Sequence, residues 1–367
     1  MILISTQCFP PASGGIETLM YSLSNALAMS GERVQVFADK YSSADSQLDS
    51  QQAYPVYRYG GLKAWRRRKK ARELFLYSQE HRESQLFLIT DSWKSLEHVD
   101  TRYFNKVLCL AHGTEFPEQA TASKTARIKR SLEKANYIIA NSDYTAKRLS
   151  DHVADQQKIR VIYPGITIGE EEPATDLKIS EQCTLRAPVL ITLARLERRK
   201  GQLSIICILS RLIEKYPDLL YVIAGEGSLR GELETAVQHL GLNKHVIFTG
   251  KLDGAYKSAW LRHSTLFVMP GSTVGQDVEG FGMAYIDAAC FGIPSIACNV
   301  GGAPEAVLHR QTGLVIEPEN ADTLTQAIFE LLDNRLYCKQ LGENARERAK
   351  EFLWQNKCIE YLNLLRQ

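Results

Sequence analysis

The sequence lacks the signatures of several common protein classes. It contains no run of about 18 apolar residues, which argues against a membrane-spanning helix. The eight cysteines form no Cys-x-x-Cys pair, so neither a disulfide scaffold nor a zinc ribbon is predicted, and we expect free thiols in a reducing cytosol. The opening residues Met1–Ser5 have no basic flank and do not resemble a secretory leader.

An excess of charge is also missing. The net charge of +2 at pH 7 does not predict a dedicated nucleic-acid binder, and we expect no nucleic-acid partner. The 44% hydrophobic and 23% charged residues are typical of an ordinary globular protein, and the free thiols lead us to expect a cytoplasmic location. At 367 residues the chain is longer than one hydrophobic core usually serves, so we expect two domains.

What the sequence does contain is an alternation of short β-branched runs and helical stretches, which predicts an α/β fold with parallel sheets. The predicted strands are 2–6, 33–39, 56–60, 86–91, 106–112, 136–141, 159–163, 189–195, 221–225, 246–250, 265–269, 294–298 and 313–316. Between Gly165 and Pro188 the pattern becomes polar and aperiodic, which we interpret as a connection near residue 175 between two doubly wound domains. Such sheets bind ligands at the carboxyl ends of their strands, so we expect a site in an interdomain cleft.

A glycine-rich turn follows the first predicted strand. Gly14 and Gly15 precede a helix predicted to start near Ile16 or Glu17, where backbone can approach a pyrophosphate and the helix adds N–H donors. A Gly-Gly pair before a helix is also common in ordinary turns. The turn is neither a Gly-x-Gly-x-x-Gly motif nor a Walker loop, which disfavours a dehydrogenase or a P-loop enzyme.

The first predicted strand of the second half ends in a basic loop. Arg195 and Lys200 bracket this loop and could neutralise a diphosphate, the guanidinium as a fork and the ammonium as a point charge. Arg195 is predicted to be embedded in an apolar strand end and to need an anionic partner. Arg198 and Arg199 are predicted to face solvent.

Two carboxylates lie eight residues apart in the segment 278–294. Glu279 precedes a Gly-Phe-Gly turn, and Asp287 lies inside the helix-like run that follows and stops at Gly292. The turn and the helix start offer unpaired N–H groups and a positive dipole end. This arrangement predicts an anion-binding site.

Taken in order, these motifs resemble the retaining family-4 glycosyltransferases of the GT-B fold. The resemblance rests on Gly14-Gly15-Ile16-Glu17, the Asn141-Ser142 turn, Arg195 with Lys200-Gly201, Ala224-Gly225-Glu226-Gly227, Glu279 to Asp287, Gly301-Gly302-Ala303-Pro304-Glu305 and Thr312-Gly313-Leu314-Val315. It implies two facing Rossmann-like domains, 1–170 on the acceptor side and 185–349 for the nucleotide sugar. It also implies that a final helix at about 350–367 packs back on the first domain.

The resemblance also implies roles for individual residues. Arg195 and Lys200 would bind the donor diphosphate and stabilise the leaving group, so that no metal or other cofactor is required. Glu279 would lie near the donor sugar, and His112 would hold a sugar hydroxyl and support positive charge at the anomeric carbon. The backbone contacts implied are Gly14, Gly15, Phe281, Gly282 and Met283.

One position departs from the family pattern. The second carboxylate of the motif is usually glutamate and binds the ribose, whereas this chain has Asp287. The loss of one methylene shortens the reach by about 1.3 Å, so we expect a bridging water or a shifted ribose. Asn141-Ser142-Asp143 is expected to cap the helix that follows.

The mechanism and the donor follow from the same resemblance. Retaining enzymes of this kind are thought to let the acceptor attack the face that the diphosphate leaves, without a covalent intermediate on a residue such as Glu279. The base pocket is expected at Leu252 and Asp253, where a carboxylate can accept two N–H bonds from guanine. That favours GDP-mannose, but if Asp253 caps the next helix, a UDP-sugar (glucose, galactose or GlcNAc) remains open.

The acceptor is approached through a basic segment, Lys63–Arg72, which carries seven cations in ten residues. It is either a solvated helix face or a surface that meets anionic lipid, with Trp65 at the interface. The second interpretation predicts a peripheral enzyme at the inner face of the membrane. Its acceptor would be a glycolipid, an oligosaccharide or an envelope or extracellular polysaccharide such as lipopolysaccharide. A nucleotide-sugar epimerase and a catalytically silent binding protein, the latter suggested only by Asp287, remain alternatives.

Overall fold

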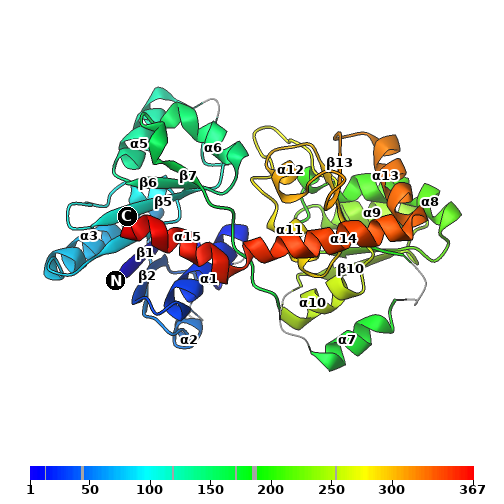
Figure 1. Ribbon diagram of the computed structural model, residues 1–367, viewed down its shortest axis with the longest axis horizontal. Helices are drawn as coiled ribbons and strands as arrows, with labels where there is room; N and C mark the ends of the chain where they lie inside the picture. Colours follow the sequence, from blue (N-terminus) through cyan, green and yellow to red (C-terminus); the bar gives the residue numbers. More distant parts are fainter. Residues whose placement is uncertain (13, 43–44, 118–119, 170–171, 184–187, 253) are drawn as a thin grey trace. The chain divides into compact units, whose positions relative to one another are not determined.

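The computed structural model describes residues 1–12, 14–42, 45–117, 120–169, 172–183, 188–252 and 254–367. The chain forms two compact units, which consist of residues 1–167 with 352–367 and of residues 168–351 (Figure 1). Each unit is a parallel sheet covered by helices on both faces, so its central strands are apolar on both sides. No helix in the described part of the chain is long and apolar enough to cross a membrane.

The first unit is built on a parallel sheet of seven strands in the order β3-β2-β1-β4-β5-β6-β7. The strands are β1 Ile2–Thr6, β2 Val34–Asp39, β3 Val56–Tyr59, β4 Phe87–Thr90, β5 Lys106–Ala111, β6 Tyr137–Ala140 and β7 Ile159–Val161. The helices are α1 Gly15–Met29, α2 Asp45–Asp49, α3 Lys63–Glu80, α4 Trp93–Leu96, α5 Ala122–Glu133, α6 Asp143–Leu149 and α15 Trp354–Arg366.

Alternating residues of β1 enter two different cores of this unit. Ile2 and Ile4 pack with α1 and with Trp354 and Tyr361 of the C-terminal helix α15, which lies next to α1 (Figure 1). Leu3 faces the opposite core, which α3, α4 and α5 cover. Burial of β1 on both faces fixes its carboxyl end, where the glycine-rich turn begins.

The second unit repeats the design with a parallel sheet of six strands in the order β10-β9-β8-β11-β12-β13. The strands are β8 Val189–Leu193, β9 Leu220–Ala224, β10 Val246–Gly250, β11 Leu266–Met269, β12 Ser295–Cys298 and β13 Gly313–Ile316. The helices are α7 Pro173–Ser180, α8 Gln202–Lys215, α9 Arg230–His239, α10 Gly254–Arg262, α11 Met283–Cys290, α12 Ala303–Ala306, α13 Ala321–Asp333 and α14 Arg335–Ala349.

The predicted strands agree with the structure, with ends that differ by no more than two residues. The cap is also confirmed, because Oγ of Ser142 accepts a hydrogen bond from N of Thr145 at 3.0 Å. The prediction of an aperiodic connection around residue 175 is wrong, because a helix occupies the middle of this segment. Pro173 begins α7, whose Asp176 accepts from Arg262 of α10 at 2.6 Å, so this helix is part of the second unit.

Candidate active site

The loop after β8 carries the cations that the sequence assigns to the diphosphate. Nε2 of Gln202 donates to the carbonyl of Arg195 at 3.0 Å, and N of Leu196 donates to the carbonyl of Glu226 at 2.9 Å. Gly201 has a φ of +77°, and a Cβ there would lie 2.2 Å from the carbonyl oxygen of Pro270. The backbone that presents Lys200 therefore depends on glycine at position 201.

Arg195 is not embedded as predicted. Strand β8 ends at Leu193, two residues earlier than the sequence suggests, so Arg195 lies in the loop. Its side chain is 64% exposed, and its Nη1 lies 2.8 Å from Oε1 of Glu197. The anionic partner is thus a neighbour on the same loop, and the guanidinium lies in solvent at the carboxyl edge of the sheet.

Arg199 and Lys200 converge on Glu279. The ammonium of Lys200 donates to Oε2 of Glu279, and Nη1 of Arg199 donates to the same oxygen at 3.2 Å. The three side chains are only 12 to 20% exposed. The prediction that Arg199 faces solvent is therefore wrong, while Arg198 does face solvent and pairs with Glu232 at 3.0 Å.

This cluster is charged despite its burial. Burial alone would raise the pKa of Glu279, but Lys200 and Arg199 hold that pKa below its ordinary value. Burial lowers the pKa of Lys200, and the nearby carboxylate of Glu279 opposes that change. A carboxylate that shares its charge with two cations is a poor nucleophile. Because Arg199 is also bound by Glu197 at 3.1 Å, another anion would have to compete with both carboxylates for these cations.

The backbone around Glu279 is set by the turn that the sequence singles out. Gly282 precedes α11 with a φ of +96°, and a Cβ there would meet the ring of Tyr285 at 2.5 Å. N of Gly302 donates to the carbonyl of Glu279 at 2.9 Å. Phe281 is buried, and the half-buried Met283 begins α11, so the amides from 281 to 283 lie at a helix start, as predicted.

Asp287 lies in the second turn of α11, and its Oδ1 is bound by Nζ of Lys257 at 3.1 Å. Both side chains are about four-fifths buried, with 21% and 24% exposure. This contact with α10 is one that the sequence did not predict. Leu252 is half-buried, and Asp253, the residue expected to read the base, lies outside the described residues.

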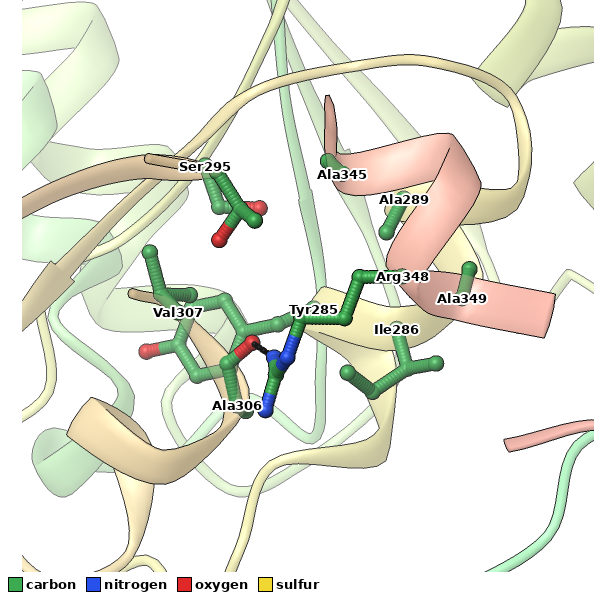
Figure 2. Close-up of a pocket in the computed structure, with 10 residues that line it drawn as sticks. Tyr285, Ile286, Ala289, Ser295, Ala306, Val307, Ala345, Arg348 and Ala349 are labelled. Carbon is green, nitrogen blue, oxygen red and sulfur yellow. Dashed lines mark hydrogen bonds between the residues drawn. The ribbon is translucent and has the colours of Figure 1, made fainter. Parts of the chain in front are cut away.

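Two small cavities adjoin α11. One is lined by Lys200, Glu279 and Ser272 among others and holds about 10 Å³, room for about one water molecule. The other lies between α11, α12 and α14 (Figure 2), where Arg348 donates to the carbonyls of Ala306 at 2.7 Å and Glu305 at 2.6 Å. Arg348 thereby satisfies the carboxyl end of α12, so the second cavity is a packing feature.

In the first unit, the predicted phosphate turn lies at the start of α1. Gly15 is the first residue of the helix, and the carbonyl of Gly14 accepts from N of Thr18 at 3.1 Å. A Cβ on Gly14 would lie 2.3 Å from Oε2 of Glu17. The turn therefore brings bare backbone and the first N–H groups of a 15-residue helix to the carboxyl edge of this sheet.

His112 follows β5 and is buried. Its Nε2 lies 2.8 Å from the carbonyl oxygen of Asp91, which can only accept, so Nε2 carries a proton, and in a neutral imidazole Nδ1 is then the acceptor. Its backbone N donates to Oε1 of Glu115 at 2.8 Å. The imidazole is thus held in one tautomer at the same edge as the glycine-rich turn.

Asp91 is a residue that the sequence analysis missed. Its Oδ2 accepts from Oγ1 of Thr6 at 2.9 Å and from N of Gln7 at 2.7 Å, while its carbonyl holds His112. One residue therefore fixes both the start of the β1–α1 loop and the histidine. The sequence did contain a signal for Asp91, because it directly follows the buried strand β4, and an acidic residue at that place needs hydrogen-bond partners. No group of three or more metal-ligating side chains occurs among the residues with described placement.

The solved structures to which this chain is similar identify its class. HepE of Anabaena, solved with UDP, matches with a TM-score of 0.82 at 20% identity and covers 100% of this chain and 99% of that chain. Sucrose-phosphate synthase of Thermosynechococcus elongatus matches with a TM-score of 0.81 at 22% identity and covers 100% and 98%. At these identities the likeness establishes the fold, and the two parallel-sheet Rossmann-like units define a GT-B protein.

The family follows from the sequence matches. The family described as Glycosyltransferase Family 4 matches residues 13–170, and Glycosyl transferases group 1 matches residues 177–348. The chain belongs to glycosyltransferase family 4, and it is a hexosyltransferase. The resemblance of the motifs to family 4 and to the GT-B fold is confirmed over nearly the whole length.

Curated relatives match along part or nearly all of the chain. The GDP-mannose-dependent alpha-(1-6)-phosphatidylinositol monomannoside mannosyltransferase of Mycolicibacterium smegmatis is 27% identical over 374 residues, which is 99% of this chain and 98% of the relative. The D-inositol 3-phosphate glycosyltransferase of Jonesia denitrificans is 27% identical over 245 residues, which is 63% of this chain and 57% of the relative.

Proposed function

We propose that the protein is a retaining mannosyltransferase that moves mannose from GDP-mannose to a glycolipid acceptor. The observation that carries the donor assignment is the full-length similarity to GDP-mannose-dependent mannosyltransferases. The acceptor assignment rests on the same relatives, whose names specify a phosphatidylinositol monomannoside. The family and the hexosyltransferase activity do not depend on either assignment.

The second unit would bind the donor. Arg195 in solvent and the buried Lys200 and Arg199 supply positive charge where a diphosphate would lie. Such preorganised cations stabilise the charge that develops on a departing nucleoside diphosphate. On this basis we expect transfer without a required metal ion, and activity should persist in excess EDTA.

Glu279 would position the donor sugar without forming a covalent bond. Its Oε2 already accepts from two cations, which weakens it as a nucleophile. The acceptor hydroxyl would attack the face that the diphosphate leaves, and the departing phosphate would take its proton. Nδ1 of His112 would accept from a sugar hydroxyl and favour positive charge at the anomeric carbon.

The first unit would face the acceptor and a membrane surface. Trp65 is 75% exposed on α3, beside exposed cations of the Lys63–Arg72 segment. A basic helix with an exposed tryptophan is suited to the headgroup region of an anionic bilayer. Flotation with vesicles that shows no dependence on anionic lipid would contradict this contact and leave the transfer reaction untouched.

The donor is tested by comparing GDP-mannose with UDP-glucose, UDP-galactose and UDP-GlcNAc, using labelled sugar and a phosphatidylinositol mannoside acceptor. We expect transfer from GDP-mannose with the anomeric configuration retained, and tighter calorimetric binding of GDP than of UDP. Tighter binding of UDP would favour the UDP-sugar alternative. Release or epimerisation of the labelled sugar without acceptor would favour an epimerase. Binding of the nucleotide sugar without turnover would favour a catalytically silent binding protein.

A further inference from the structure

The cations of α3 divide into two groups with different surroundings. Lys70 and Arg66 approach the carboxylate of Asp39 at 2.8 and 3.4 Å, and Arg67 pairs with Glu97 at 3.2 Å. These three side chains are at most 19% exposed, so they hold α3 against the unit. Three of the seven cations of the basic segment are therefore structural and do not form a binding surface.

Arg68 and Arg72 belong to the other group. Both are exposed, and neither has a carboxylate within ion-pair distance among the residues whose placement is described. They are four residues apart and thus adjacent on one face of the helix, and Phe75 follows on the same face. Two guanidinium groups side by side without counter-charge repel each other, and an anion between them would remove that repulsion.

These residues line an open pocket. Arg68, Ala71, Arg72 and Phe75 of α3 form one wall, and His98 and Asp100, which follow α4, form the other. Its volume is about 270 Å³. Ala71 is buried and short, which leaves space between the longer arginine and phenylalanine side chains.

The single carboxylate of the pocket is already neutralised. Asp100 is bound by Nη2 of Arg102 at 2.7 Å and by its Nε at 3.0 Å, and the pKa of Asp100 is lowered by these hydrogen bonds. The guanidinium of Arg102 lies 5.7 Å from the ring centre of Phe75. The charges of Arg68 and Arg72 are therefore left for a ligand.

The pocket lies apart from the candidate active site. Gly15 and His112 stand at the carboxyl ends of β1 and β5. Helix α3 starts at that edge with Lys63, but Arg68 to Phe75 lie from the second turn onward, and His98 to Asp100 lead away toward the start of β5. A ligand here would contact the first unit on the helical layer of one face.

We propose that this pocket binds a phosphate group borne on a polyol, either in a lipid headgroup or in a soluble phosphorylated sugar. Guanidinium forks match phosphate oxygens in bidentate geometry. The pocket is far larger than the one-water cavity beside Glu279, at about 270 against about 10 Å³, which leaves room for an attached ring against Phe75. The proposal does not rest on the donor assigned above.

The test compares two double variants of the full chain that each remove two exposed cations from α3. R68Q/R72Q empties the pocket of charge, and K63Q/K69Q leaves the pocket intact. Binding is measured to phosphatidylcholine vesicles with and without phosphatidylinositol, and to soluble inositol 1-phosphate by calorimetry. GDP binding and thermal unfolding of both variants serve as controls for folding and for the donor site.

We expect R68Q/R72Q to lose about tenfold or more in affinity, as the loss of charged hydrogen bonds implies, with K63Q/K69Q changed much less. If R68Q/R72Q loses binding of inositol 1-phosphate and K63Q/K69Q keeps it, the pocket is a site open to soluble ligands. A selective loss confined to phosphatidylinositol vesicles would support a lipid headgroup. Equal losses in the two variants would show a diffuse charge effect and overturn the proposal, as would unchanged binding in R68Q/R72Q. Absence of GDP binding in every form would count against the transferase donor site and leave the pocket result interpretable.

Discussion

Nη1 of Arg199 and Oε2 of Glu279 lie 3.2 Å apart in the second unit, and the ammonium of Lys200 binds the same oxygen. A diphosphate that binds these cations has to compete with Glu279 for them. If the diphosphate binds as proposed, the carboxylate occupies part of its site in the structure. Donor binding would then release Glu279 toward the sugar, next to which the resemblance of the motifs implies that it lies.

This exchange predicts an unusual result for Glu279→Gln. The neutral amide no longer competes for Lys200 and Arg199, so GDP affinity is expected to stay the same or to rise. Transfer is expected to fall by about 100-fold or more, as for the loss of a charged group that acts on the transition state. Calorimetry with GDP and a labelled transfer assay measure the two effects separately.

The same variant has a consequence for stability. Removal of one partner from a buried ion pair leaves uncompensated charge and costs about 3 kcal/mol, so the nucleotide-free variant should unfold at a lower temperature. The matched control is Glu232→Gln, which breaks the exposed pair with Arg198 on the same loop and should cost less than about 1 kcal/mol. Equal losses in the two variants would contradict the buried cluster.

A second prediction concerns the ribose. Lys257 binds one oxygen of Asp287, so we expect Asp287 to offer its other oxygen to one ribose hydroxyl. Asp287→Glu restores the reach of the usual family residue and is expected to tighten GDP binding about threefold to tenfold, within the range of one added hydrogen bond.

The deoxy analogues of GDP provide the control for this prediction. The gain in Asp287→Glu should shrink for 2′-deoxy-GDP or for 3′-deoxy-GDP, depending on which hydroxyl the longer side chain reaches. Lys257→Met should weaken GDP binding by freeing Asp287 from its anchor. If both variants bind GDP and both deoxy analogues like the wild type, Asp287 does not contact the ribose.

The strands were predictable because most of them are apolar on both faces and are bounded by turn residues, so their lengths can be read directly from the chain. The order of the candidate site residues was predictable for a similar reason, since they follow those strands. The direction of side chains within the loops could not be predicted from the sequence. Arg195 and Arg199 occupy the same basic loop, but Arg199 lies in the 3₁₀ turn Arg198–Lys200 and contacts Glu279, whereas Arg195 precedes that turn and lies in solvent.

Long-range polar contacts were equally out of reach. Asp91 holds Thr6, Gln7 and His112 across the sheet, and nothing local to Asp91 in the chain specifies these partners. Helix α7 was missed because its residues show little apolar periodicity, and its docking depends on Arg262, a residue far along the sequence.

A third prediction is a loss of stability in mild acid that involves His152. Burial lowers the pKa of His152 from 6.5, with Lys129 and Arg148 acting in the same direction and Asp151 against it. Its ring packs on Phe116 at 5.6 Å. His152 binds a proton more readily in the unfolded chain than in the folded one. The stability that neutral, buried His152 contributes to the fold is therefore complete above about pH 6.5 and is lost as the pH falls below that value.

Urea unfolding at pH 7.5 and pH 5.5 measures this effect. His152→Phe keeps the ring packing and should lose less stability between the two pH values than the wild type. His239→Phe, at an exposed histidine, should leave the pH dependence unchanged. A wild-type pH dependence that survives in His152→Phe would assign the effect to another group.

The last prediction concerns the backbone next to Lys200. Gly201→Ala places a Cβ in left-handed backbone and 2.2 Å from the carbonyl oxygen of Pro270, so the loop has to move. The strain of a left-handed alanine costs about 1–2 kcal/mol, and the displaced Lys200 should weaken GDP binding by about tenfold. The matched control is Gly231→Ala, at the second residue of α9 with no atom within 4 Å of the new Cβ. There alanine favours the helix and should stabilise the protein by up to about 1 kcal/mol. Thermal unfolding measures the stability of both variants, and calorimetry measures their GDP affinity. Full GDP affinity in a folded Gly201→Ala variant would show that Lys200 does not bind the diphosphate.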